Sequence, residues 1–393
     1  MRSILAWGAA LAFLAGSAFA AEPVEIKIGY LRGPPIKTRL SLMDVPAEDE
    51  GVAGARLGLD DDNTTGRFID QTFSIVEKRL KAGEDPVAAA TALADQHAQL
   101  LLVDLDADSL LKVADAMKGK GGLVFNISAI DDRLREEDCR AGVVHVAPAR
   151  TMLADALAQY LVWKKWRKWL LVFGSHDKDK ALADAYRRAA KRFGAKIVEE
   201  REFKDTGGAR RTDSGIVELQ RQIPGFLQGA ADHDVVITAD ESEVFAGYVP
   251  YRTWDPRPVA GSAGLTATTW NPAFDQWGAV QLQNRFIKIN RRFMTPLDLQ
   301  AWTAIRMIGE GAAHAGSGEP AVIAGYVKGP EFSVAGFKGQ KLTLREWNGQ
   351  LRQPILLFDG RNTVSVSPQE GFLHQFTELD TLGLDRPETK CKL

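Results

Sequence analysis

The chain has 393 residues, of which 45% are hydrophobic and 25% are charged. Single hydrophobic cores stop growing at about 250–300 residues, so this length indicates two cores. The net charge of −2 comes from interspersed acids and bases, which argues against binding to nucleic acid or to an anionic membrane surface. After residue 20 no segment has the roughly 20 apolar residues of a membrane-spanning helix, so we expect no direct membrane insertion.

The first 20 residues have the order of a secretory signal peptide. A basic residue, Arg2, precedes an apolar run that ends in Ala18-Phe19-Ala20. We therefore predict cleavage between Ala20 and Ala21 and export of the remaining chain.

Strands and helices are predicted to alternate along the rest of the chain. The first series has strands at 24–31, 72–80, 100–105 and 122–128, with helices at 51–63, 86–96 and 109–117. The same rhythm restarts at His145, with helices at 152–163, 181–194, 216–227, 279–293 and 297–315, and strands at 169–174, 195–203, 234–240, 341–347 and 354–360. Short apolar strands separated by helices are typical of parallel sheets covered on both faces. Two such series predict an α/β protein with two doubly wound parallel-sheet lobes.

In open α/β sheets, ligands bind outside the carboxyl ends of the strands. The loops that follow the predicted strands are therefore the candidate ligand loops: residues 32–35, 104–108, 126–132, 174–178 and 240–243.

One of these loops carries Asp104, Asp106 and Asp108 at alternate positions. Oxygen ligands at this spacing match the start of a calcium-binding EF-hand loop, but the sixth position is Ser109 instead of glycine and the twelfth is Asp115 instead of glutamate. A helix cap explains one of the acids well and a second acceptably. Three acids exceed what capping needs, so the three aspartates are also a candidate metal site.

The sequence gives no positive support for an enzyme. It contains no HExxH, GxSxG or GxxxxGK[ST] motif, and no cofactor motif was found. His176 and Asp177 occupy a strand-to-helix loop, where the pair can be surface or capping residues, ligand contacts or, least favoured, catalytic groups. No nucleophile is tied to a base and an orienting group, so we expect a protein without catalytic residues.

The two cysteines, Cys139 and Cys391, have neither CxxC nor metal-ligand spacing. In an oxidising compartment they can form one disulfide between the middle of the chain and its C-terminal end. The sequence does not say whether the two residues approach each other.

Together with the signal peptide and the two α/β lobes, residues 156–203 resemble type I periplasmic substrate-binding proteins of the leucine/isoleucine/valine class. More narrowly, DNTTGRF (62–68), LREWNGQLRQPI (344–355), SPQEGFLH (367–374) and the C-terminal LDTLGLDRPETKC resemble a subgroup encoded with PQQ-dependent alcohol dehydrogenase systems. The resemblance implies a multi-strand hinge, with lobe I formed by residues 24–145 and 263–345 and lobe II by residues 146–262 and 346–393. It also implies a monomer in the periplasm that passes a small solute to an ABC permease.

Amino-acid-binding members of this family hold the ligand carboxylate in loops after the third and fourth strands of the first lobe. Here Ser109, Ser128 and Ala129 can keep part of that cradle, but the three aspartates would repel a carboxylate, including those of PQQ. The second lobe adds further candidate contacts at His176, Asp177, Asp240 and Glu241, with Glu243 nearby. These acids favour a metal ion, metal chelate or amine over a neutral organic solute or an amino acid.

Three tryptophans, Trp254, Trp270 and Trp277, lie in the segment between the predicted lobes. They can stack on a flat or aliphatic ligand, although packing between the lobes is the simpler interpretation. The leading hypothesis is a substrate-binding protein of an ABC importer. The alternative is a sensor module that presents its ligand-bound state to a membrane receptor.

Overall fold

The computed structural model describes residues 24–34, 45–205 and 213–393. The predicted signal peptide, residues 1–20, lies outside the described residues.

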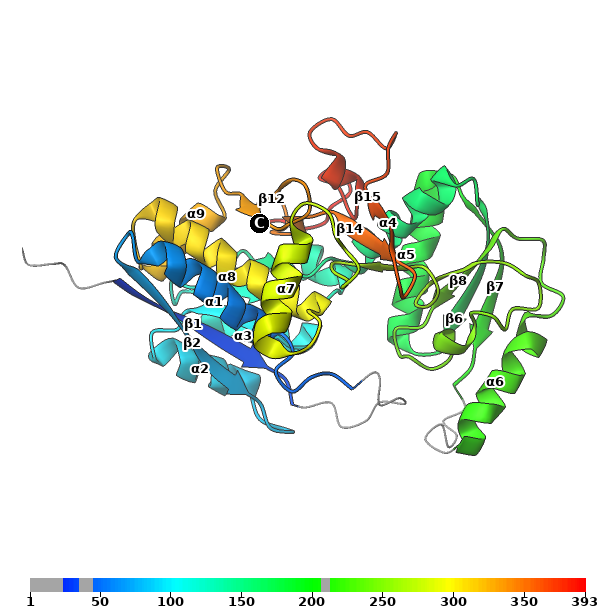
Figure 1. Cartoon of the computed structure of the whole chain (residues 1–393), viewed down its shortest axis with the longest axis horizontal. Helices are drawn as coiled ribbons and strands as arrows, with labels where there is room; N and C mark the ends of the chain where they lie inside the picture. Colours follow the sequence, from blue (N-terminus) through cyan, green and yellow to red (C-terminus); the bar gives the residue numbers. More distant parts are fainter. Residues whose placement is uncertain (1–23, 35–44, 206–212) are drawn as a thin grey trace, which may run out of the picture.

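In the first lobe, five described strands form one parallel sheet (Figure 1). In spatial order they are β2 (Gln71–Arg79), β1 (Val24–Arg32), β3 (Leu100–Asp104), β4 (Leu123–Asn126) and β5 (Val143–His145). The central strands β3 and β4 consist largely of buried apolar residues, as expected of strands covered on both faces, whereas the edge strand β2 is more polar and only partly buried.

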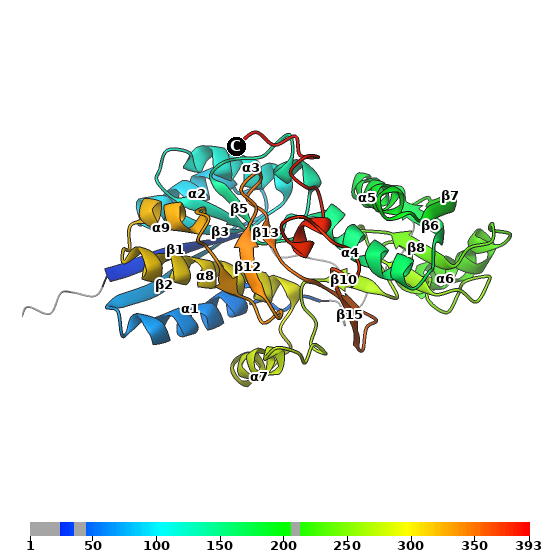
Figure 2. The same cartoon turned by 90° about the horizontal axis from the view of Figure 1, so that it is seen from above.

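Helices cover both faces of this sheet, as the view from above makes clear (Figure 2). One face packs against α1 (Val52–Gly66), α8 (Pro296–Ala315) and α9 (Pro320–Val327). The other packs against α2 (Pro86–Asp95) and α3 (Ala107–Met117). A separate helix, α7 (Ala279–Asn290), packs on the outer side of α1 and α8 through the cluster that contains Trp270 and Phe274.

The second lobe has its own parallel sheet, in the order β7 (Lys196–Phe203), β6 (Lys168–Gly174), β8 (Val235–Ala239) and β9 (Val259–Gly261) (Figure 1). Helices α4 (Arg150–Trp163) and α5 (Asp177–Phe193) cover one face. Helix α6 (Asp213–Leu227) and the short 3-10 helix η3 (Ala246–Tyr248) cover the other. The predicted α/β fold with two parallel-sheet lobes is confirmed.

The chain passes between the lobes three times: from β5 to α4, from β10 (Thr266–Thr268) to α7, and from β13 (Leu351–Arg352) to β14 (Ile355–Phe358). Beyond the last crossing, β14 pairs with β10 and β15 (Thr363–Ser367), whose sheet lies against α4. On the lobe I side, β11 (Val334–Ala335), β12 (Lys341–Leu344) and β13 form a small antiparallel sheet. The 3-10 helices η2 (Asp132–Arg135) and η4 (Glu378–Thr381) complete the connections.

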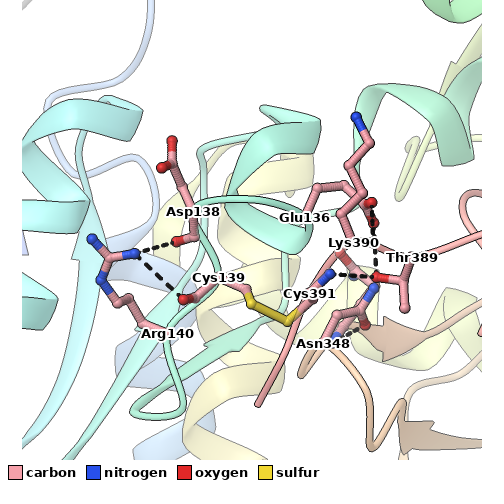
Figure 3. Close-up of a disulfide and its surroundings, with 9 residues drawn as sticks. Glu136, Asp138, Cys139, Arg140, Asn348, Thr389, Lys390 and Cys391 are labelled. Atoms are coloured by element: carbon pink, nitrogen blue, oxygen red, sulfur yellow. Dashed lines mark hydrogen bonds between the residues drawn. A yellow bond between two sulfur atoms is a disulfide. The ribbon is translucent and has the colours of Figure 1, made fainter.

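Cys139 and Cys391 form a disulfide, with 5.7 Å between their Cα atoms (Figure 3). Beside it, Glu136 accepts hydrogen bonds from the Thr389 hydroxyl at 3.0 Å and from the Lys390 backbone N–H at 2.7 Å. The last residues of the chain are therefore held against the loop that follows β4 by a covalent bond and by hydrogen bonds.

Candidate functional site

The two lobes meet where the loops after β4 and β8 approach the start of α4. Arg150, the first residue of α4, lies between these loops. Its Nε and Nη2 atoms donate to the two carboxylate oxygens of Glu241 at 2.5 and 2.8 Å, and its Nη1 atom lies 3.4 Å from Asp131. Since Asp131 follows β4 and Glu241 follows β8, one guanidinium group joins the carboxyl ends of both sheets.

Arg150 is charged and almost fully buried, with 4% of its side chain exposed. Burial by itself lowers the pKa of Arg150, but the hydrogen bond to Glu241 and the charges of Glu241 and Asp131 outweigh it and raise the pKa. A bidentate guanidinium–carboxylate pair combines charge with a fixed geometry, so Arg150 and Glu241 hold the loop after β8 in one orientation.

Asp132 adds a second link at the same place. Its Oδ1 atom accepts hydrogen bonds from the backbone N–H of Thr151 at 3.1 Å and from the Thr151 hydroxyl at 2.6 Å. Burial raises the pKa of Asp132, although these hydrogen bonds from Thr151 favour the charged form. The first turn of α4 therefore interacts with two consecutive aspartates of the lobe I loop.

Sequence reasoning missed Arg150, Asp131, Asp132 and Thr151, although residues 131 and 132 lie in a loop that it had selected. One feature of the sequence could have indicated this contact. A basic residue at the start of a helix is next to the positive end of the helix dipole, which is unfavourable unless carboxylates are close. Arg150 follows Pro148 and Ala149 and lies two residues before the helix predicted over 152–163, so an acidic partner could have been sought.

A second arginine, Arg135, lies beneath the junction and is buried. It donates to Gln350 Oε1 at 2.8 Å and to the carbonyls of Ala129 and Ala147 at 2.9 and 2.8 Å. Burial lowers the pKa of Arg135 to about 9. Gln350 in turn donates to the His145 carbonyl at 3.0 Å, so this network ties η2 and the segment before β13 to the end of β5.

The third crossing is held by a buried lysine. Lys338 donates to Gln353 Oε1 at 2.7 Å and to the Pro354 carbonyl at 3.1 Å, and Gln353 donates to the Val146 carbonyl at 2.8 Å. Burial lowers the pKa of Lys338 to about 7. Lys338 and Gln353 thereby connect the first crossing with the third.

The three aspartates of the β3–α3 loop do not form the metal site suggested by their spacing. Asp106 caps α3 by accepting the Ser109 N–H at 3.0 Å, and Asp108 pairs with Arg133. Burial raises the pKa of Asp104, which lies near Ser128. In the described part of the chain, no three His, Cys, Asp or Glu side chains are grouped so that they could hold a metal ion. Each of the three acids has a different neighbour, so they are not grouped around one point in this structure.

The hydroxyl and backbone groups predicted as a ligand cradle lie close to these acids. The Ser109 hydroxyl donates to Asp106 Oδ2 at 2.8 Å, which makes it part of the helix cap. The Ser128 hydroxyl lies 3.4 Å from the Leu105 carbonyl, and the Ala129 N–H donates to Asn126 Oδ1 at 2.9 Å. Ser109 and Ser128 are both partly buried and Ala129 is buried, and the Ser128 side chain also hydrogen-bonds with Asp104 at the carboxyl end of β3.

In lobe II, His176 and Asp177 are exposed at the start of α5, and His176 Nε2 lies 2.8 Å from Asp205 Oδ2. Asp240 is buried, and its carboxylate accepts the backbone N–H groups of Val244, Phe245 and Ala246 at 2.9, 2.7 and 2.6 Å. Burial raises the pKa of Asp240 and outweighs these hydrogen bonds, which lower it. Its carboxylate therefore stabilises the 240–246 loop and does not join Glu241 in a shared cation site.

The three tryptophans do not form one stacking surface. Trp270 is buried and donates from Nε1 to Gln283 Oε1 at 3.0 Å, while Trp277 is half exposed beside Gly339. Trp254 lines a cavity at the other end of lobe II. Packing explains Trp270, and neither of the others lies at the junction.

Comparisons with known proteins agree with this architecture. Residues 46–217 match the sequence profile of a family described as periplasmic binding protein. A periplasmic binding protein from Burkholderia mallei superposes with a TM-score of 0.67 at 16% identity, covering 93% of this chain and 98% of that one. The fold is that of the type I periplasmic binding proteins.

Two further type I periplasmic binding proteins carry names that state a ligand class. A leucine-, isoleucine-, valine-, threonine- and alanine-binding protein from Brucella ovis, in a closed conformation, has a TM-score of 0.66 at 16% identity over 86% of this chain and 89% of that one. A branched-chain amino acid ABC transporter ligand-binding protein from Burkholderia xenovorans has a TM-score of 0.68 at 16% identity over 88% and 92%. No curated protein matches the sequence. Among the described residues, no helix is both long and apolar enough to cross a membrane.

Proposed function

We propose that the chain is an exported, monomeric substrate-binding protein of an ABC importer. It binds a small solute between its lobes in the periplasm and delivers the solute to a permease, without catalysing a reaction. The lobes would divide near the predicted bounds, residues 24–145 with 263–345 and residues 146–262 with 346–393. The second and third bounds would lie a few residues later, at the crossings that follow β10 and β13. The ligand would stabilise a closed arrangement of the lobes that the permease recognises. The motifs at 62–68, 344–355 and 367–374 further favour a role beside a PQQ-dependent alcohol dehydrogenase.

The observation that carries this proposal is the contact of Arg150 with Asp131 on one side and Glu241 on the other. It brings the carboxyl ends of two separate parallel sheets to one junction, and ligands bind at this edge in open α/β folds. The names of the structural neighbours add a ligand class, branched-chain and other uncharged amino acids, that fits a site between two such edges.

The charges at the junction favour a solute without net charge. Arg150 is paired with acids, Asp240 is bonded to backbone N–H groups, and Asp106 caps a helix, so each of these groups is already bonded within the protein. A zwitterionic amino acid and an uncharged product of alcohol metabolism both satisfy this condition. The Ser128 hydroxyl and the exposed His176 are the candidate ligand contacts.

A thermal-shift screen tests the proposal. The purified protein is heated with leucine, isoleucine, valine, short alcohols and aldehydes, and separately with Ca²⁺, a lanthanide citrate and PQQ. A ligand that binds only the folded state raises the unfolding midpoint with concentration. We expect a saturable shift from one uncharged or zwitterionic solute and a smaller radius of gyration in solution scattering with that solute. If only Ca²⁺ or the lanthanide raised the unfolding midpoint, the proposed ligand class would be contradicted. If a solute raised the midpoint without reducing the radius of gyration, closure of the lobes around it would be contradicted.

A further inference from the structure

A concave site lies at the end of lobe II that is opposite the junction. A cavity of about 630 Å³ opens between the end of α4, the first residues of β8 and β9, and β15; its wall includes Tyr160, Val235, Val259 and Val364. Val235 begins β8, whereas Glu241 follows the other end of that strand, which is about 13 Å long at 3.3 Å per residue. The cavity is therefore separate from the interlobe junction.

Aromatic and proline side chains form much of this wall. The aromatic residues are Tyr160, Trp166, Tyr251 and Trp254, and the prolines are Pro250, Pro256 and Pro258. Trp254 is 53% exposed and Tyr251 is fully exposed. Tyr251 also has a φ of 67°, a left-handed conformation that residues other than glycine rarely adopt. At the edge of the cavity one large ring is thus fully exposed and a second is half exposed.

The charged groups in the wall balance each other. Arg257 pairs with Asp232 at 3.2 Å, outside the cavity wall, and both side chains are substantially exposed. The Asp359 carboxylate accepts the backbone N–H groups of Arg361 and Asn362 at 2.8 and 2.6 Å. One cation and one anion, each with its own partner, give the cavity no net preference for a charged ligand.

We infer that this cavity binds a small, flat, uncharged aromatic molecule. Its volume lies within the range of about 300–1,000 Å³ that is typical of small-molecule sites. Flat aromatic ligands stack on tryptophan and tyrosine faces more favourably than their apolar surface alone would give. The site is independent of the solute bound at the junction and goes beyond the proposed function.

The test uses 2-naphthol as the probe and its saturated counterpart, decahydro-2-naphthol, as a shape-related control without an aromatic ring. Binding to the purified full-length protein is measured by saturation-transfer NMR and calorimetry. We expect saturable binding of 2-naphthol and binding of decahydro-2-naphthol that is about tenfold weaker. Trp254→Ala should weaken 2-naphthol binding by about tenfold, whereas Trp254→Phe, which keeps a ring, should retain most of it.

Trp163→Ala is the matched control, because Trp163 is 52% exposed in the same lobe but does not line the cavity. It should change the affinity for 2-naphthol less than twofold, and Glu241→Gln at the junction should also leave it unchanged. Equal binding of the saturated compound, equal losses in the two tryptophan variants, or a loss in Glu241→Gln would each overturn the inference. So would self-association in sedimentation that Trp254→Ala abolishes, because the cavity would then be an interface between copies.

Discussion

Two acid-rich loops at the carboxyl edge of the lobe I sheet use their charges differently. After β3, Asp106 and Asp108 are exposed; Asp106 caps the helix that begins beside it, and Asp108 pairs with a single arginine of the neighbouring η2. After β4, Asp131 and Asp132 interact with the first turn of a helix in the other lobe. The number of acids in a loop therefore says little about its role, which depends on the partner and on its burial.

The comparison predicts that the largest loss of stability follows from removing Arg150. Arg150→Ala leaves Glu241 and Asp131 without their shared buried cation, and breaking a buried pair in this way costs about 3–5 kcal/mol. Urea unfolding monitored by circular dichroism measures the change in the free energy of unfolding. Arg187→Ala is the matched control, because Arg187 also contacts two acids, Asp184 and Glu200, but on the lobe II surface. It should cost about 1 kcal/mol or less, and equal losses would refute the special role of the junction.

Lys338 at the third crossing gives a second prediction, with a defined pH dependence. Its pKa is about 7 in the folded protein against 10.5 ordinarily, so between these values the unfolded chain holds the proton that the folded chain releases. Above pH 10.5 the lysine is neutral in both states and does not lower the free energy of unfolding. As the pH falls from 10.5 towards 7, the unfolded chain gains the proton first and the free energy of unfolding decreases. Lys338→Met removes the dependence but also removes two hydrogen bonds.

The variant should therefore be more stable than the native protein by about 2 kcal/mol at pH 7, and less stable by about 1 kcal/mol at pH 10. Urea unfolding at several pH values measures this reversal. Lys341→Met, an exposed position three residues later, is the control and should show no reversal. If the two variants have parallel pH profiles, Lys338 keeps its proton in the folded state.

Most of the fold could be predicted from the sequence, because long elements repeat their apolar pattern many times. The prediction of a helix over 152–163 and a strand over 169–174 lies within two residues of α4 and β6. Elements of two or three residues, such as β9, β10 and β13, were missed since they are too short to show a period and form only through tertiary pairing.

The candidate site was predicted only in part, for a related reason. The position of the ligand loops follows from strand order, which a sequence can suggest. The pairing of Arg150 with Glu241 joins residues 91 positions apart, and no local pattern encodes that contact. The loop after β3 was predicted as a site because its three aspartates are close together in the sequence. The role that the structure gives Asp106, capping α3, is also a contact between residues close in sequence.

The loop after β3 supplies the third prediction. Asp106→Ala removes the side chain that accepts the Ser109 N–H at the start of α3, and a lost cap costs about 1 kcal/mol. Burial raises the pKa of Asp106, but the hydrogen bonds from Ser109 outweigh burial, so the pKa lies below its usual value. The contribution of this cap to the free energy of unfolding should therefore be lost when the carboxylate is protonated at acidic pH. Hydrogen exchange should accelerate in α3 and not in α4. Faster exchange in both helices would mean that this loop also supports the junction.

The smallest effect is expected at Asp108, which carries the same charge two residues later. Its side chain is 76% exposed and its partner Arg133 also pairs with Asp138 at 2.6 Å, so Arg133 keeps an acid when Asp108 is replaced. Exposed pairs of this kind contribute little, and Asp108→Asn should change the free energy of unfolding by less than about 0.5 kcal/mol. The change in the free energy of unfolding should be equally small in 0.05 and 0.5 M salt, because the exposed pair contributes little that salt could screen. A loss as large as that of Arg150→Ala would mean that the acids of the β3 loop, and not those after β4, connect to the rest of the molecule.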